Sequence, residues 1–129
     1  MNSTSQYFPV ASCPGIAGDE AAPYDKRWLV VDPAGRWLTQ SENARLADVS
    51  VAIRFGFLVM RAPGMVRMDI PLDVIEDDDS VRKRVMVGEQ LVDAVDEGEL
   101  AATWLSGFTG MPCRLVKVHP DAGPVAWPV

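Results

Sequence analysis

The sequence predicts a mainly β protein, a β-barrel of several short strands with one amphipathic helix near the C-terminus. Short apolar runs, many alternating with polar residues, recur along the chain and are separated by Pro, Gly and Asp. This spacing is typical of barrels and sandwiches. A single segment near the C-terminus instead carries apolar residues at helical spacing. The 129 residues fit one domain, 1–129, with one core.

The N-terminal third predicts a strand followed by a β-hairpin. The first strand, Tyr7–Val10 in the stretch YFPVASCPGI, runs into a turn of Ser, Cys, Pro and Gly. The apolar run Arg27–Asp32 is followed by the turn residues Pro33–Gly35 and by a return strand, Arg36–Gln40. We therefore expect a hairpin around Asp32–Gly35.

Six further strands are expected, because six more segments are short, rich in apolar or β-branched residues and bounded by turn residues. In the first of them Val49, Val51 and Ile53 share one face, since side chains alternate along a strand. The six segments are Asp48–Phe55, Gly56–Arg61, Met65–Leu72, Val81–Val87, Gln90–Val95 and Arg114–Val118.

The segment GELAATWLSGFTGMP predicts one helix, from about Gly98 to Phe108. Gly110 suits the left-handed residue that ends a helix, and Pro112 prevents its continuation. This helix is expected to plug or cap an open end of the barrel. Residues 119–129 hold three prolines and no periodicity, which predicts an extended tail. The apolar stripe of the helix consists of Leu100, Ala101, Trp104, Leu105 and Phe108.

Composition excludes several classes of protein. Apolar residues make up 48% and charged residues 23%, as in ordinary soluble domains. Acidic residues outnumber basic ones by 18 to 12, and the net charge of −6 argues against nucleic-acid binding. No run approaches the ~18 apolar residues of a membrane span, so no membrane association is expected. The N-terminus, MNSTSQ, lacks the features of a secretory signal, and the cytoplasm is the expected compartment.

The cysteines, the histidine and the acidic run give no sign of a metal or catalytic centre. Cys13 and Cys113 lie far apart, with no C-x-x-C motif, so neither structural zinc nor a cytosolic disulfide is expected. The run Glu76–Ser80 lacks the spacing of an EF-hand and is interpreted as a solvated loop. His119 has no partner motif for general-base chemistry. Metal binding and catalysis by this chain alone are therefore not expected.

Three blocks of the sequence resemble the signature blocks of the MOSC N-terminal β-barrel domain family. They are YFPVASCPGI, YDKRWLVVDPAGRWLTQSENARLADV and VDEGELAATWLSGFTGMPCRLVKV, and they span most of the chain from Tyr7 to about Val118. In that family the barrel precedes a MOSC domain in molybdenum-cofactor sulfurases, amidoxime-reducing components and related bacterial flavin-reductase-linked proteins. The resemblance implies a β-barrel, in agreement with the strand pattern.

The resemblance also implies a role beside a cofactor. In the family the barrel helps to form the cleft for molybdopterin and substrate, whereas the metal-ligating cysteine belongs to the MOSC domain. We expect that this chain is the barrel without that domain, so that Cys13 does not replace the ligand and no cofactor is bound by the chain alone. The expected partner is a separate MOSC-domain protein, with which molybdopterin would be shared.

The predicted cofactor-binding residues are Ser12 and Lys26. The family commonly reads P-V-K-S-C-x-G in the first block, where the Lys-Ser pair approaches the cofactor phosphate. Here Ala11 precedes Ser12, so the hydroxyl remains and the cation does not. The family's D-R-x-W is D-K-R-W at residues 25–28, so Lys26 keeps the charge but not bidentate geometry. Arg27 is expected on the other face of its strand. The resemblance thus implies a weakened phosphate site.

Each conspicuous residue also has a structural interpretation. Ser12 is equally suited to a turn, and Cys13 to the core. Lys26 and Arg27 are also typical of solvated strand ends. The remaining residues interpreted as packing or scaffold are Trp28, Trp37, Arg45 and Trp104.

Three functions are compatible with these observations. The first is an accessory or binding module that contributes to a molybdopterin or substrate cleft with a MOSC partner. The second is a truncated or split fragment of a molybdenum-cofactor-dependent oxidoreductase. The third is a structural module that associates with itself and binds no ligand.

Overall fold

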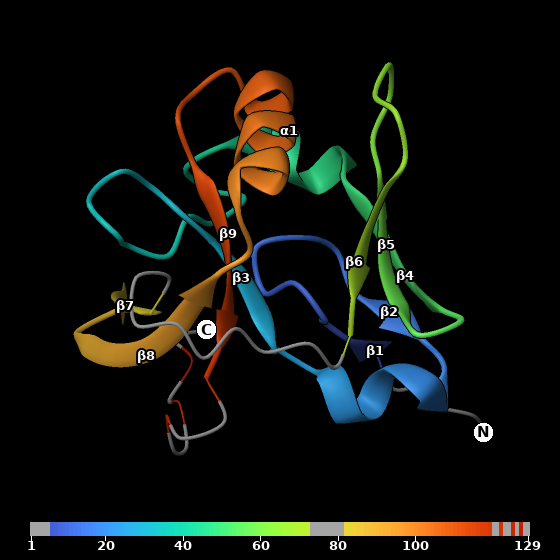
Figure 1. Cartoon of the computed structure of the whole chain (residues 1–129), viewed down its shortest axis with the longest axis horizontal. Helices are drawn as coiled ribbons and strands as arrows, with labels where there is room; N and C mark the ends of the chain where they lie inside the picture. The colour runs from blue at the N-terminus through green and yellow to red at the C-terminus, as the bar shows by residue number, and fades with distance from the viewer. Residues whose placement is uncertain (1–5, 73–81, 120–121, 123–124, 126, 128–129) are drawn as a thin grey trace.

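The computed structural model describes residues 6–72, 82–119, 122, 125 and 127. Over these residues strands dominate, with one α-helix, α1 (Glu99–Thr109), near the C-terminus, which confirms the predicted class (Figure 1). The predicted Glu76–Ser80 loop and the residue Val81 lie outside the described residues. The strands are β1 (Gln6–Tyr7), β2 (Ile16–Ala17), β3 (Trp28–Val31), β4 (Ser50–Arg54), β5 (Phe57–Arg61), β6 (Met68–Pro71), β7 (Arg82–Val87), β8 (Gln90–Asp96) and β9 (Arg114–Val118).

The strands form three antiparallel sheets, with the orders β1-β2, β3-β9-β8-β7 and β4-β5-β6. Within the described ranges these sheets do not close into one barrel. The predicted hairpin is present, because Asp32 N–H donates to Arg36 O and Gly35 N–H to Asp32 O. Its return arm makes only isolated bridges, Val31 with Trp37 and Arg36 with Met86. The arm therefore connects β3 with β7 instead of forming a ladder with either.

The predicted first strand is also shorter than expected. Only Gln6 and Tyr7 form β1, and Val10 makes an isolated parallel bridge with Trp28. Pro9 interrupts the strand because proline has no N–H to donate to a ladder.

β3 is the end strand of the four-stranded sheet, and all four of its residues are buried. Trp28 and Val30 face a larger apolar cluster, to which β4, β5, β6, β9 and α1 also contribute. Leu29 and Val31 face a smaller cluster, built with β7, β8 and β9. Burial on both faces explains why this strand is continuously apolar rather than alternating.

Helix α1 agrees with the predicted span to within one residue at each end. Gly110 follows it in the left-handed region, with φ 77°, and its N–H donates to Ser106 O. The helix packs along β9, and its buried face joins the larger cluster. Leu100, assigned to the apolar stripe, is instead 77% exposed because it faces away from the core. No helix in the described part of the chain is long and apolar enough to cross a membrane.

The described residues of the predicted C-terminal tail lie against the molecule. Ala122, Val125 and Trp127 pack on the smaller cluster, and the Trp127 ring meets Trp37 edge-on at 5.1 Å between centroids. These contacts place Trp127 beside the return arm of the hairpin.

Candidate functional site

The segment 8–12 runs parallel to β3 and positions both predicted site residues. Lys26 N–H donates to Phe8 O at 2.7 Å, and Trp28 N–H donates to Pro9 O at 2.9 Å. At the other end Val30 N–H donates to the Ser12 hydroxyl at 3.0 Å. Ser12 and Lys26 therefore lie at opposite ends of this pairing, Ser12 beside Val30 and Lys26 in the turn before β3.

The Ser12 side chain serves the backbone of β3. It is 1% exposed, accepts from Val30 N–H and donates back to Val30 O at 3.4 Å. The Ser12 hydroxyl thus satisfies both the N–H and the C=O of Val30, in the place of a backbone partner from a neighbouring strand. A ligand contact by Ser12 stays a prediction.

Lys26 stands in a turn before β3, in the left-handed region with φ 56°. Two hydrogen bonds with the backbone of Phe8 fix this turn. Phe8 N–H donates to Asp25 Oδ1 at 2.7 Å, and Lys26 N–H donates to Phe8 O. The conformation is uncommon for a residue with a side chain. It places Lys26 beside the C-terminal segment.

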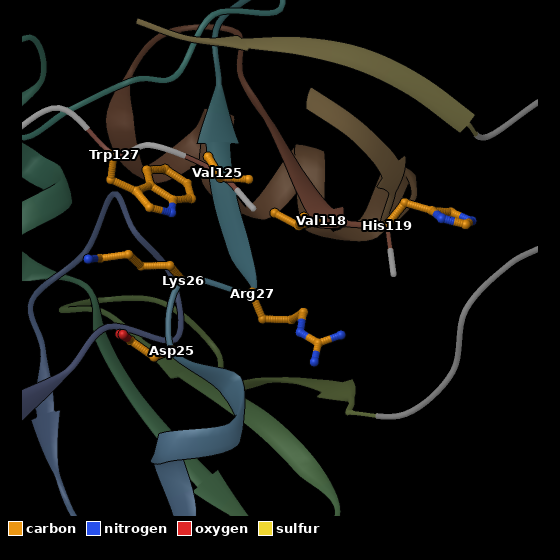
Figure 2. A pocket seen from close by; sticks show the side chains of 7 residues that line it. All are labelled: Asp25, Lys26, Arg27, Val118, His119, Val125 and Trp127. Atoms are coloured by element: carbon orange, nitrogen blue, oxygen red, sulfur yellow. The ribbon is translucent and has the colours of Figure 1, made fainter. Parts of the chain in front are cut away.

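A pocket of about 510 Å³ opens at this turn. Figure 2 shows the Lys26 side chain on the same side as the Trp127 indole, while the Arg27 side chain points the opposite way. This agrees with the expectation that Arg27 lies on the other face from Lys26. Both cations nevertheless line the pocket, and the His119 imidazole lies at its far side. The lining residues are Asp25, Lys26, Arg27, Val118, His119, Val125 and Trp127.

This pocket suits a ligand with an anionic end and an aromatic body. Lys26 and Arg27 supply positive charge, and Asp25 already accepts a hydrogen bond from Phe8 N–H. Trp127 offers an aromatic surface. Ala11, at the position where the resemblance implies a lysine, packs on the smaller cluster together with Val125 and Trp127. The positive charge that the family's lysine would supply is therefore absent at Ala11, and the alanine makes apolar contacts instead.

The residues from 118 onwards were not predicted as part of a site. Val118, His119, Val125 and Trp127 come from the end of β9 and from the segment expected to be an extended tail. An isolated tryptophan in a proline-rich segment was the one available signal, because such a large apolar side chain favours burial.

The cysteines are unsuited to ligate a metal. Cys13 is 1% exposed, and burial raises the pKa of its thiol to about 12, so the thiol stays protonated at neutral pH. Cys113 is also buried, in contact with the Thr109 hydroxyl at 3.5 Å. No group of three or more metal-ligating side chains occurs among the described residues.

A buried polar cluster at β9 was not foreseen from the sequence. The Lys117 side chain is almost fully buried, donates to Leu72 O and lies 5.1 Å from the centre of the Trp28 ring. Trp28 Nε1–H donates to Glu97 Oε2 at 2.6 Å. Burial raises the pKa of Glu97, although this hydrogen bond and the Lys117 charge oppose the shift. These contacts join the ends of β6, β8 and β9.

The comparison with family models identifies the MOSC N-terminal beta barrel domain over residues 4–112. Molybdenum cofactor sulfurase from Homo sapiens is 30% identical over 118 residues, which cover 85% of this chain and 13% of the human protein. The enzyme of that name from Danio rerio is 32% identical over 123 residues, 88% of this chain and 15% of its own.

A second kind of relative and one solved structure agree with this result. Mitochondrial amidoxime-reducing component 1 from Xenopus laevis is 28% identical over 126 residues, 88% of this chain and 36% of the relative. This chain thus spans well under half the length of these relatives. A solution structure of a Bordetella bronchiseptica protein is 60% identical, with a TM-score of 0.82 and 98% of both chains covered. With the family match over most of its length, this chain belongs to the MOSC N-terminal beta barrel domain family.

Proposed function

We propose that this chain is a binding module that supplies one wall of a molybdopterin or substrate cleft, while a separate MOSC-domain protein supplies the rest. Family membership supports the role, and the relatives carry the matching region as a minor part of longer proteins. The observation that carries the proposal is the pocket in which Lys26 and Arg27 lie beside the Trp127 ring.

The residues present fit the organic part of such a cofactor. In this proposal Lys26 holds the phosphate as a point charge, and the heterocycle rests against Trp127. Ser12 contributes indirectly in this proposal, because its hydrogen bonds with Val30 fix the segment 8–12 against β3. When bound, the cofactor would supply the redox metal, and a cysteine of the partner would hold that metal, since Cys13 is buried and protonated.

A split oxidoreductase is the second candidate. It is favoured by the fact that the human and Xenopus relatives extend far beyond the matching region. The two candidates differ in the partner, because a split enzyme predicts activity on mixing with its MOSC half, whereas an accessory module predicts binding without a new reaction.

Replacing Lys26 by Ala should weaken the binding of inorganic phosphate and of molybdopterin in titration calorimetry. The loss should shrink as salt rises, because exposed charges are screened within about 10 Å at 0.1 M salt. Arg36→Ala is the matched control, since Arg36 is an exposed cation on the hairpin outside the pocket lining. Equal affinities of wild type and Lys26→Ala would reject Lys26 as an anion contact.

A separate titration tests the partner. A MOSC-domain protein should bind the wild-type chain, and the complex should retain molybdopterin better than the MOSC protein alone. Absence of binding in the presence of the cofactor would contradict the accessory role.

A further inference from the structure

The outer face of the β4-β5-β6 sheet has an unusual composition for a solvent-exposed surface. The registers place Arg54 beside Phe57 and Pro71, Ala52 beside Val59 and Asp69, and Ser50 beside Arg61. The opposite face of the same strands packs into the larger cluster. The outer side therefore carries Phe57 and the buried Val59 between Arg54 and Arg61, with Asp69 beside Val59. We call Arg54, Phe55, Phe57, Val59, Arg61 and Arg67 the arginine–phenylalanine face.

Phe55 is the most exposed large apolar side chain described in this chain, at 98%. With Gly56 it forms the two-residue turn between β4 and β5, and both residues have positive φ, 50° and 83°. Such turns favour Asn, Asp or Gly, because other side chains collide with the backbone there. Phe55 thus strains the turn and contributes no buried area. The fold gives no reason for a phenylalanine at this position, and strain of this kind is typical of binding sites.

The face is concave and positively charged. A cavity of about 640 Å³ lies over it, lined by its six residues together with Ala52 and Asp69. Arg67 pairs with Asp69 at 3.1 Å, whereas Arg54 and Arg61 have no carboxylate within ion-pair distance among the described residues. This local excess of positive charge stands on a chain whose net charge is −6. Exposed aromatic and arginine side chains are the types enriched at the centres of protein interfaces.

We propose that the arginine–phenylalanine face is a docking surface for an acidic segment of a partner protein that inserts a bulky apolar side chain. Charge complementarity selects an acidic partner, because three arginines and a single aspartate line the cavity. Because the face is concave, it fits a side chain inserted from a partner protein better than the flat surface of a lipid bilayer. The face shares no lining residue with the Lys26 pocket, so the proposal does not depend on that pocket.

A synthetic peptide provides the test. The probe is an octapeptide with Leu-Phe at its centre and Asp or Glu at the other positions, titrated to about 1 mM into the ¹⁵N-labelled full chain. We expect amide shift changes along β4 and β5 and none around Lys26. The same peptide with Ser-Ser at its centre should bind at least tenfold more weakly, as should one in which Lys replaces the acidic residues.

Variants of the protein separate docking from stability. Phe55→Asn should raise the melting temperature, because Asn tolerates the left-handed region, and should weaken peptide binding at least tenfold. Arg61→Gln should weaken binding by a factor that falls as salt rises. Leu100→Gln and Arg36→Gln, which change an exposed leucine and an exposed arginine elsewhere, should leave the affinity unchanged.

Several outcomes would overturn the proposal. They are equal affinity of Phe55→Asn and wild type, equal binding of the Ser-Ser peptide, or shift changes centred on Lys26. Binding to vesicles of phosphatidylcholine and phosphatidylglycerol, lost in Phe55→Asn while the peptide fails to bind, would assign the face to a membrane surface. A dimer in light scattering that Phe55→Asn dissociates would assign it to a second copy of this chain.

Discussion

Asp96 and Glu97 are neighbours at the end of β8, and the fold shifts their carboxylates in opposite directions. Burial alone would raise the pKa of Asp96, but hydrogen bonds from Arg114, Gly98 N–H and Lys83 outweigh it and lower the pKa. Glu97 has one strong donor, Trp28, and burial dominates there. The two pKa values shift in opposite directions because Asp96 accepts more hydrogen bonds than Glu97 does.

Acid should therefore destabilise the protein through Asp96. Because its pKa is lower in the folded than in the unfolded chain, its stabilising contribution is present above about pH 4 and is lost as the pH falls through the folded value. Asp96→Asn should reduce the free energy of unfolding by about 2 kcal/mol at neutral pH, the typical effect of losing hydrogen bonds between charged groups, since Arg114 and Lys83 are partly exposed. Urea titrations between pH 2 and 7 measure both effects.

Asp93→Asn is the matched control for this measurement. Asp93 pairs with Arg82 and Arg84 at a more exposed place on the same strand, so the substitution should cost less than about 1 kcal/mol. An equal acid slope in wild type and Asp96→Asn would show that other groups carry the pH dependence.

The sequence indicated which residues make polar contacts better than it indicated the partners of those contacts. The residue types at Ser12 and Lys26 indicated polar contacts, but a serine hydroxyl satisfies backbone groups as readily as a ligand, and only the register with β3 shows its partner. Lys117 gave no signal of burial, because a lysine normally keeps its charged group in water.

The elements were predictable where a local pattern decides them. Alternation gave the strands from β4 to β6 within two or three residues at each end, and helical spacing gave α1. The return arm of the hairpin was predicted as a strand and makes only isolated bridges. Its pairing depends on where β7 lies, and the sequence of the arm carries no information about that distant strand.

The end of α1 offers a test of backbone conformation that packing does not complicate. A Cβ added at Gly110 or at Gly107 meets no atom within 4 Å, yet only Gly110 has a positive φ. Gly110→Ala should therefore cost about 1–2 kcal/mol, the penalty of the left-handed region. Gly107→Ala should stabilise the protein by up to about 1 kcal/mol, because alanine favours a helix interior.

Thermal and urea unfolding of the two variants measure this difference in sign. Circular dichroism at 222 nm provides the control that both variants keep the helix. Equal stabilities would mean that α1 ends without help from the left-handed residue.

At the scale of the whole molecule the sequence predicted the mainly β class and the family, but not how the sheets join. Strand patterns carry no information on closure, and the described strands form three sheets instead of one closed barrel. The contacts of the C-terminal segment were equally invisible, since residues 119–129 have no periodicity from which packing is inferred. That segment turns out to complete the Lys26 pocket.

Trp127→Ala should show how firmly this segment is held. Loss of the edge-on contact with Trp37 should reduce the free energy of unfolding by about 1 kcal/mol, typical of an aromatic pair. Molybdopterin should bind more weakly, whereas inorganic phosphate, held by Lys26, should bind nearly as before. Trp127→Phe, which keeps an aromatic ring, is the control. Unchanged stability in Trp127→Ala would mean that the contact is incidental.

The pairing of β3 with β9 has a consequence for biosynthesis. β3 pairs with β9, which lies more than eighty residues later in the chain. During translation β3 leaves the ribosome early and stays without its neighbour until Val118 has emerged. Contacts between such distant parts of a chain slow folding. The nascent chain therefore exposes the apolar strand β3 until β9 has been made, and such exposed apolar segments favour aggregation.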